Sequence, residues 1–166
     1  ASSGTAVVPD NVSRGLTAAC IMSRAAGVDV FPIDIGVAAD TKVYTDKIAY
    51  GTKNMLKEPA MTREEAEGSI LAGIRAAKRL KKEGYQILLT GEMGIGNTTT
   101  SSAVASVLLG EDSESLSGRG AGLSDAGLQR KREVIRRAIG LWKPDPADPV
   151  DVLAKVGGFD IGGLAG

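Results

Sequence analysis

The most regular pattern of apolar residues lies between positions 62 and 84. Thr62 and Glu65 have the spacing of a capping box at a helix start, and Gly84 is a typical helix stop. Between them, apolar residues recur every three or four positions, which is the spacing of one helix face. These residues are Ala66, Ile70, Ile74, Ala77 and Leu80. The pattern predicts an amphipathic helix whose charged residues form a solvated face rather than a binding patch.

Other segments predict further helices. Asp10 or Asn11 is expected to cap the first of them, and Gly27 to end it. Asn97 is expected to cap the second. The predicted helices cover residues 10–26, 97–109, 124–141 and a short stretch that ends near Val156 after a proline-rich link.

Two apolar segments predict strands, separated by a long polar connection and the helix over 62–84. Residues 28–37 are apolar and β-branched except where Asp29 and Asp34 interrupt them, as in a buried parallel strand, although Pro32 cannot donate a ladder hydrogen bond. Residues 86–90 form a second, shorter segment, which leads through glycines into a helix as in half of a βαβ unit. The predicted fold class is α/β, with a parallel sheet flanked by helices in a Rossmann-like three-layer arrangement.

A glycine-rich turn over 91–96 joins the second predicted strand to the helix that Asn97 begins. Amides at a helix N-terminus bind anions, and glycine lets the backbone approach a ligand closely. Gly91 and Gly96 have the spacing of a phosphate loop, but Asn97 replaces the lysine that reaches the outer phosphates of a nucleoside triphosphate. The turn therefore predicts a site for a monophosphate or a carboxylate. A tight turn without a ligand is the alternative.

A lysine interrupts the apolar face of the helix predicted over 124–141. Lys131 lies three residues from Leu128 and four from Ile135, so it shares their face. A lysine in that position either extends its amine to solvent or meets an anion, and both readings stay open. The preceding glycines, from 118 to 122, form either a flexible loop or a second backbone cradle for a phosphate.

The composition excludes several kinds of chemistry and partner. The 166 residues include 20 basic and 20 acidic side chains, so no net charge attracts nucleic acid or an anionic membrane. No apolar run approaches the ~20 residues of a membrane helix, and no signal peptide is visible, so a cytoplasmic location is expected. Cys20 is the single cysteine and histidine is absent, so no metal site or histidine-based triad is expected. Carboxylates, lysine, hydroxyls and amides remain for chemistry, and no cofactor is expected.

The segment Gly91-Glu92-Met93-Gly94-Ile95-Gly96-Asn97-Thr98-Thr99 resembles the signature of the nicotinate-nucleotide:dimethylbenzimidazole phosphoribosyltransferase family, which builds the lower-ligand nucleotide of cobalamin. Further motifs of the family follow in the same order along most of residues 24–166. They are Asp34-Ile35-Gly36-Val37 with Asp40, Gly51-Thr52-Lys53-Asn54, Glu58-Pro59-Ala60-Met61-Thr62, Gly118-Arg119-Gly120-Ala121-Gly122-Leu123 and Gly157-Gly158-Phe159-Asp160-Ile161.

The resemblance implies a transferase that moves ribose-5-phosphate from nicotinate mononucleotide to 5,6-dimethylbenzimidazole or a related base. It implies a large parallel-sheet α/β domain, a smaller helical domain from the two chain ends, and a homodimer. Residues 1–166 would be a single phosphoribosyl-binding domain of a longer enzyme, truncated at both ends, because the chain has no initiator Met and ends in a glycine cluster.

The resemblance also assigns site residues. Glu92 would act in catalysis by positioning or electrostatics, while the family's general base, a glutamate nearer the C-terminus, would lie outside this chain. Asp160 would line the pocket, although capping the next helix is the alternative. The expected substrate-binding residues are Met93, Gly94, Gly96, Asn97, Thr98, Gly120, Gly122, Lys131 and Asp160.

One departure from the family concerns the base that accepts the ribose. Members carry a Pro-Gln-x-Val-Thr stretch that helps to hold the benzimidazole, and residues 3–7 take its place here. The acceptor could then be adenine or a phenolic compound. Two other functions stay open from the residues alone: a phosphate- or nucleotide-binding module without chemistry, and a nucleotide hydrolase that uses the glycine turn.

Overall fold

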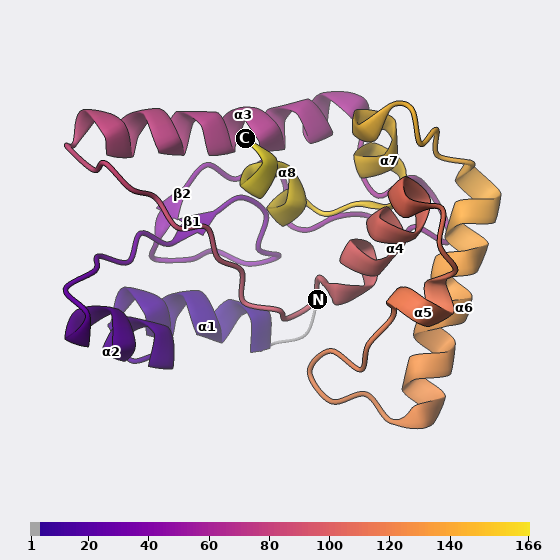
Figure 1. Ribbon diagram of the computed structural model, residues 1–166, viewed down its shortest axis with the longest axis horizontal. Coiled ribbons are helices and arrows are strands. Elements are labelled where there is room, and N and C mark those ends of the chain that lie inside the picture. Colours follow the sequence, from indigo (N-terminus) through magenta and orange to yellow (C-terminus); the bar gives the residue numbers. More distant parts are fainter. Residues whose placement is uncertain (1–3) are drawn as a thin grey trace. The chain divides into compact units, whose positions relative to one another are not determined.

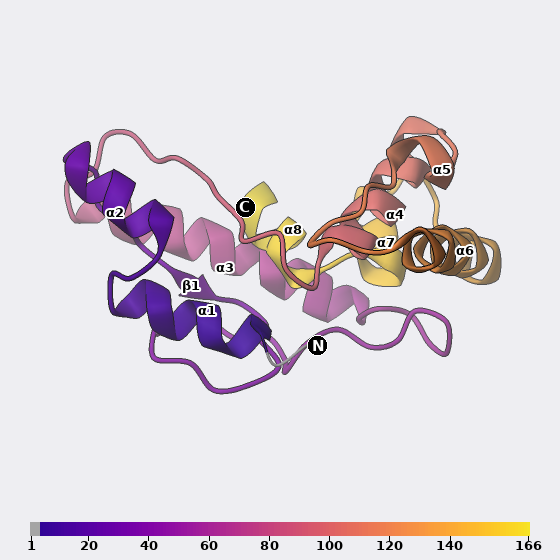
Figure 2. The ribbon, with the colours of Figure 1, turned by 90° about the horizontal axis from the view of Figure 1, so that it is seen from below.

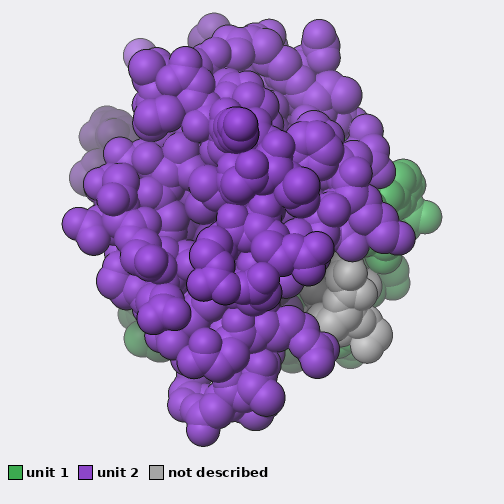
Figure 3. All heavy atoms as spheres, turned by 90° about the vertical axis from the view of Figure 1, so that its right-hand side faces the viewer, with its two compact units in different colours: residues 1–51 green, residues 52–166 purple. Residues whose placement is uncertain are grey.

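The computed structural model describes residues 4–166, with side chains from Val7 onward (Figure 1). The chain divides into two compact units, residues 1–51 and 52–166, which Figure 3 colours separately. Within the described part, no helix is both long and apolar enough to cross a membrane.

The first unit begins with two short helices, α1 (Gly4–Ser13) and α2 (Ala18–Ala25). The prediction of one helix over 10–26 is wrong, because Gly15 adopts a left-handed φ of 70° and breaks the segment. The cap of α2 is Thr17, whose hydroxyl accepts from the Cys20 amide at 3.3 Å, rather than Asp10 or Asn11. Gly27 follows α2 with φ 67°, as expected of a helix stop.

The sheet of this unit is much smaller than predicted. Strands β1 (Ile33–Asp34) and β2 (Tyr44–Thr45) pair in parallel, with Ile33 opposite Tyr44. The predicted strand over 28–37 is therefore reduced to two residues. A strand forms only where a neighbouring strand completes its hydrogen-bond ladder. Among the described residues, β2 is the neighbour of β1, and it pairs with only two residues of the predicted segment.

A buried carboxylate organises the connection after β1. Asp34 is 1% exposed, and its Oδ2 atom accepts from Lys47 Nζ and from Thr41 Oγ1, each at 2.7 Å. Lys47 Nζ also donates to the carbonyl oxygens of Val37, at 2.6 Å, and Ala39, at 3.0 Å. A buried charge needs such a set of partners, so the Asp34–Lys47 pair fixes the chain between β1 and β2.

The second unit is helical. Its helices are α3 (Arg63–Lys82), α4 (Thr98–Leu109), α5 (Ser113–Leu116), α6 (Asp125–Trp142), α7 (Pro149–Val156) and α8 (Phe159–Ala165). The predicted capping box of Thr62 and Glu65 is confirmed, and Gly84 follows α3 with φ 101°. Ser124 caps α6 and Asp148 caps α7. The four helices predicted in this unit are thus present.

Glycine allows α8 to lie directly on α3 (Figures 1 and 2). A Cβ atom on Gly162 would lie 1.9 Å from Ser69 Oγ, and one on Gly73 would lie 2.1 Å from the Gly163 carbonyl oxygen. Any side chain at these glycines would separate the two helices. The start of α8, which carries Asp160, is therefore held in place by α3.

A second packing region joins α4, α6 and α7 around a small apolar core. Ile135 and Ala138 of α6 are fully buried, together with Ala103 of α4 and Val152 of α7. At the edge of this core, Trp142 Nε1 donates to the Met55 carbonyl oxygen at 2.7 Å. Packing of α6 on α4 brings Lys131, one turn before Ile135, to the start of α4.

The predicted strand over 86–90 is not formed. Its residues have no regular secondary structure, and Ile87 and Leu89 are 79% and 82% exposed. Apolar character alone does not make a strand, and no described segment offers these residues a backbone ladder. The α/β class is thus represented by helices and one small parallel sheet in the part that the structure describes. The three-layer arrangement stays a prediction.

Candidate phosphoryl-binding site

Two glycines of the turn before α4 have a left-handed backbone conformation. Gly94 has φ 71° and Gly96 has φ 80°, conformations that side-chain-bearing residues rarely adopt. Asn97 follows at the N-cap position, but no side chain caps α4. The main-chain amides of residues 98–100 have no hydrogen-bond partner in the described part of the chain. Together with the helix dipole, these open donors favour an anion.

Lys131 places a buried cation at the same helix start. The residue is 5% exposed, so its amine does not extend to solvent. Lys131 Nζ donates to Thr98 Oγ1 at 3.1 Å and to the Gly118 carbonyl oxygen at 3.0 Å. No carboxylate pairs with it among the described residues, and burial lowers the pKa of the amine. An anion beside Lys131 would favour its charged form and receive the third N–H bond.

The glycine loop over 118–122 lies against Thr98. Gly120 has φ 55°, and a Cβ atom there would lie 2.8 Å from Thr98 Oγ1. Arg119 closes the loop through its bonds to the Leu123 carbonyl oxygen, at 2.9 Å, and the Asp125 carboxylate. Gly122 has φ 103°, but a Cβ atom there would meet nothing within 4 Å. Gly120 therefore borders the site, while no contact brings Gly122 to it.

Asn97 and Asp160 are hydrogen-bonded partners 63 residues apart in sequence. Asn97 Nδ2 donates to Asp160 Oδ2 at 2.8 Å, and Asn97 Oδ1 is buried without a described partner. Asn97 thus occupies the predicted N-cap position of α4, but the expected side-chain cap is absent, and the amide nitrogen bonds Asp160 instead. The cap of α8 is Gly158, not Asp160. Burial raises the pKa of Asp160 and the charge of Glu92 adds to the rise, while the Asn97 hydrogen bond opposes it.

Glu92 is tied to the turn by its own backbone. Its carboxylate accepts a hydrogen bond from the Gly94 amide, which leaves one fewer amide for a ligand than the sequence predicts. The negative charge of Glu92 also contributes to the raised pKa of Asp160. Met93, which follows Glu92, is 38% exposed, and no contact assigns it to the site.

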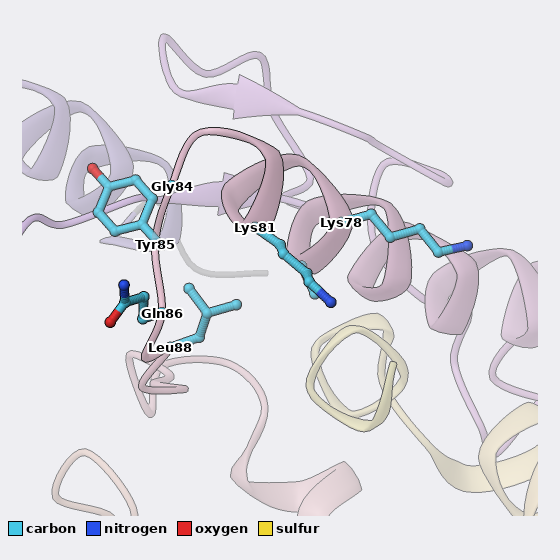
Figure 4. Close-up of a pocket in the computed structure, with 7 residues that line it drawn as sticks. Lys78, Lys81, Gly84, Tyr85, Gln86 and Leu88 are labelled. Atoms are coloured by element: carbon cyan, nitrogen blue, oxygen red, sulfur yellow. The ribbon is translucent and has the colours of Figure 1, made fainter.

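A separate pocket of about 660 Å³ lies at the end of α3 (Figure 4). Residues of α3 and of the segment after it line this pocket: Ala77, Lys78, Lys81, Gly84, Tyr85, Gln86 and Leu88. None of the predicted site residues takes part. Lys78 and Lys81 contribute two cationic side chains to its lining.

Comparisons with known proteins agree with the motifs. A family model described as phosphoribosyltransferase matches residues 1–166. The nicotinate-nucleotide–dimethylbenzimidazole phosphoribosyltransferase of Ruminiclostridium cellulolyticum is 50% identical over 98% of this chain and 47% of its own length. The protein of that name from Desulforudis audaxviator is 47% identical over 100% of this chain and 50% of its own. The chain spans about half the length of the curated relatives it matches.

Solved structures give the same result. The crystal structure of CobT from Thermus thermophilus matches with a TM-score of 0.89 and 38% identity, over 96% of this chain and 49% of that one. The family resemblance noted in the sequence is therefore confirmed. The chain belongs to the phosphoribosyltransferase family that includes the nicotinate-nucleotide–dimethylbenzimidazole phosphoribosyltransferases.

Proposed function

We propose that the protein transfers ribose-5-phosphate from nicotinate mononucleotide to 5,6-dimethylbenzimidazole or a related base. The products are nicotinate and an α-ribazole phosphate-type nucleotide for the lower loop of cobalamin. Family membership and the names of the relatives support the reaction. The single observation that carries it in this chain is the convergence of Lys131 and Thr98 with the uncapped start of α4.

The phosphoryl group of the substrate would bind at that helix start. Its oxygens would accept hydrogen bonds from the amides of residues 98–100, from the third N–H of Lys131 and from the Thr98 hydroxyl. Thr98 Oγ1 already accepts from Lys131, so its own proton is available to a ligand. Gly94, Gly96 and Gly120 would let the backbone approach the phosphoryl group closely. Asn97 would contribute its main chain to the site rather than its side-chain amide, which bonds Asp160.

This donor set suits a monophosphate. It contains one lysine and the first turn of one helix, and Asn97 stands where a triphosphate-binding loop carries its lysine. The chemistry therefore favours a nucleoside monophosphate over ATP, which counts against the nucleotide hydrolase.

The transfer itself is a displacement at C1 of the ribose with inversion. A nitrogen lone pair of the incoming base forms the new bond, while nicotinate leaves with the electrons of the old one. The proton of the incoming base passes to a general base that the family resemblance places outside this chain. Glu92 would stabilise the positive charge that develops on the ribose ring in the transition state. Met93 would border the pocket between the two reactants, as the resemblance implies.

The choice of acceptor base would depend on residues 3–7, which replace the family's benzimidazole motif. Ser3 and the side chains of residues 4–6, within the stretch that replaces the family's benzimidazole motif, lie outside the described part. Gly122 and Asp160 are proposed as further pocket residues. A single phosphoribosyl-binding domain over 1–166, the three-layer fold of the longer protein, the homodimer and the cytoplasmic location also stay proposals, supported by family membership.

The test is to incubate the full-length protein with nicotinate mononucleotide and, in turn, dimethylbenzimidazole, adenine and a phenol. Release of nicotinate together with a new nucleotide is expected with at least one base. No release with any of them would defeat the transferase. Binding of nicotinate mononucleotide without release would instead support the non-catalytic module, and ATP hydrolysis that disappears in Gly96→Ala would support the hydrolase.

A further inference from the structure

Asn97 is an exception among the described N-cap residues that carry a side chain. Residues that cap a helix through a side chain have an extended backbone, with ψ of 156° at Thr17, 166° at Thr62 and 168° at Ser124. Asp112 and Asp148 also cap their helices. Asn97 is among the best capping residues, yet its ψ is −12° and its side chain makes no cap bond. Something must therefore oppose its ordinary role.

The Asp160 carboxylate holds the other end of this side chain, while Asn97 Oδ1, the atom that would accept from the α4 amides, is buried without a described partner. Asp160 Oδ2 accepts from Asn97 Nδ2 at 2.8 Å, and α8 is fixed by its close packing on α3. Gly158 leaves room for the carboxylate to take this position. A Cβ atom at Gly158 would lie 2.3 Å from Asp160 Oδ1 and 3.1 Å from Thr100 Oγ1, so the carboxylate sits in a space that only glycine leaves free.

We propose that Asp160 is a positioning residue that holds the Asn97 side chain away from α4 and so keeps the first-turn amides of that helix open. A free Asn97 would relax toward the extended backbone of a capping residue and accept from the amide of Thr99 or Thr100. Those are the donors that the phosphoryl group needs. The consequence for substrate rests on the proposed function, whereas the restraint on Asn97 does not.

Hydrogen exchange tests the restraint without a ligand. The full-length protein, Asp160→Ala and Asp160→Ala/Asn97→Ala are compared by mass spectrometry of peptides that cover residues 97–102. An asparagine cap slows exchange of the protected amides about fivefold. Asp160→Ala is expected to show this slowing, and the double variant is expected to lose it, because no side chain remains to cap. Peptides covering the capping box of α3 serve as the internal control for global unfolding.

Two further variants guard against a merely structural role. Asp160→Asn keeps an oxygen that can accept from Asn97 Nδ2, so its exchange is expected to match the parent. Gly158→Ala displaces the carboxylate without removing it, so it is expected to slow exchange as Asp160→Ala does. Unchanged or faster exchange in Asp160→Ala, while the α3 peptides match the parent, would overturn the proposal.

Binding of nicotinate mononucleotide separates this inference from the proposed function. If both hold, Asp160→Ala weakens binding about fivefold, and Asn97→Ala in the same chain restores it. If the parent does not bind the nucleotide but Asp160→Ala still slows exchange, the restraint stands and the proposed function fails. If the parent binds the nucleotide and exchange does not respond to Asp160→Ala, the restraint fails and the proposed function stands.

Discussion

Lys131 Nζ and Thr98 Oγ1 lie 3.1 Å apart, and they join the middle of α6 to the first residue of α4. The contact leaves both groups able to donate further, because the amine keeps one N–H and the hydroxyl keeps its proton. A buried amine without a carboxylate partner is unfavourable, and a bound anion would offset that penalty. The pair therefore forms the centre of the candidate site.

Removing the Lys131 amine should lower the affinity for the ligand without lowering the stability of the protein. Lys131→Met should weaken binding of nicotinate mononucleotide by about 10- to 100-fold, the effect of one charge-assisted hydrogen bond. The variant should unfold no more readily than the parent, because burial already disfavours the charged amine. Arg130→Met, an exposed neighbour on α6, removes the same charge and should change neither quantity. Calorimetric titration and urea unfolding measure the two effects, and equal loss of affinity in both variants would mean that net charge alone matters.

The left-handed backbone conformation of Gly94 should make an alanine unfavourable there, although the space around a Cβ atom is open. Gly94→Ala should cost about 1 kcal/mol of folding free energy and weaken phosphate binding, because a Cβ atom disfavours φ of 71°. Gly91 is the matched control, since a Cβ atom meets nothing within 4 Å at either position and Gly91 has no positive φ. Gly91→Ala should be close to neutral. The idea fails if the two alanine variants bind inorganic phosphate and unfold alike.

Alanine substitutions at Gly120 and Gly122 should rank in opposite orders for loss of affinity and for loss of stability. Both have positive φ, but only a Cβ atom on Gly120 would press on Thr98. Gly120→Ala should therefore reduce affinity for nicotinate mononucleotide more than Gly122→Ala does. Gly122→Ala should reduce stability more, because its φ of 103° lies further from the region open to alanine. Parallel titrations and thermal unfolding of the two variants decide this, and a larger affinity loss at Gly122 would contradict the arrangement.

Asp160 and Asp148 should affect the pH dependence of the protein's stability with opposite signs. Burial raises the pKa of Asp160 above its ordinary 3.8, so the folded state binds more protons than the unfolded chain just above that pH, and this contribution falls as the pH rises. Asp160→Asn should gain stability relative to the parent as the pH rises through this window. Arg63 lowers the pKa of Asp148, so that carboxylate loses its stabilising effect as the pH falls below 3.8.

Denaturant unfolding of both variants between about pH 2 and 7 tests these signs. Relative to the parent, Asp160→Asn should gain stability as the pH rises above 3.8, whereas Asp148→Asn should lose stability as the pH rises toward 3.8. The same direction of change in both variants would contradict the assigned causes.

Local signals made the helices of the second unit predictable. The capping box at Thr62, the caps at Ser124 and Asp148 and the spacing of apolar residues act within a few positions, so the sequence contains them in full. The strands failed for the opposite reason. Residues 86–90 have the composition of a strand, but a strand also requires a neighbouring ladder, which no local pattern reports.

The site shows the same division. Lys131 could be found from the sequence because a lysine on an apolar helix face requires an explanation. The commitment of Asn97 to Asp160 could not, because their hydrogen bond spans 63 positions and overrides a strong local preference for capping. The buried Asp34–Lys47 pair was missed similarly, since its partners meet only when the chain between β1 and β2 closes.

A crystal structure of the full-length protein with nicotinate mononucleotide would show whether the start of α4 and Lys131 bind the phosphoryl group. A phosphoryl oxygen is expected about 2.7–2.9 Å from Lys131 Nζ, with the amides of residues 98–100 directed at the same group. A phosphoryl group bound instead at Lys78 and Lys81, with the start of α4 empty, would contradict this expectation.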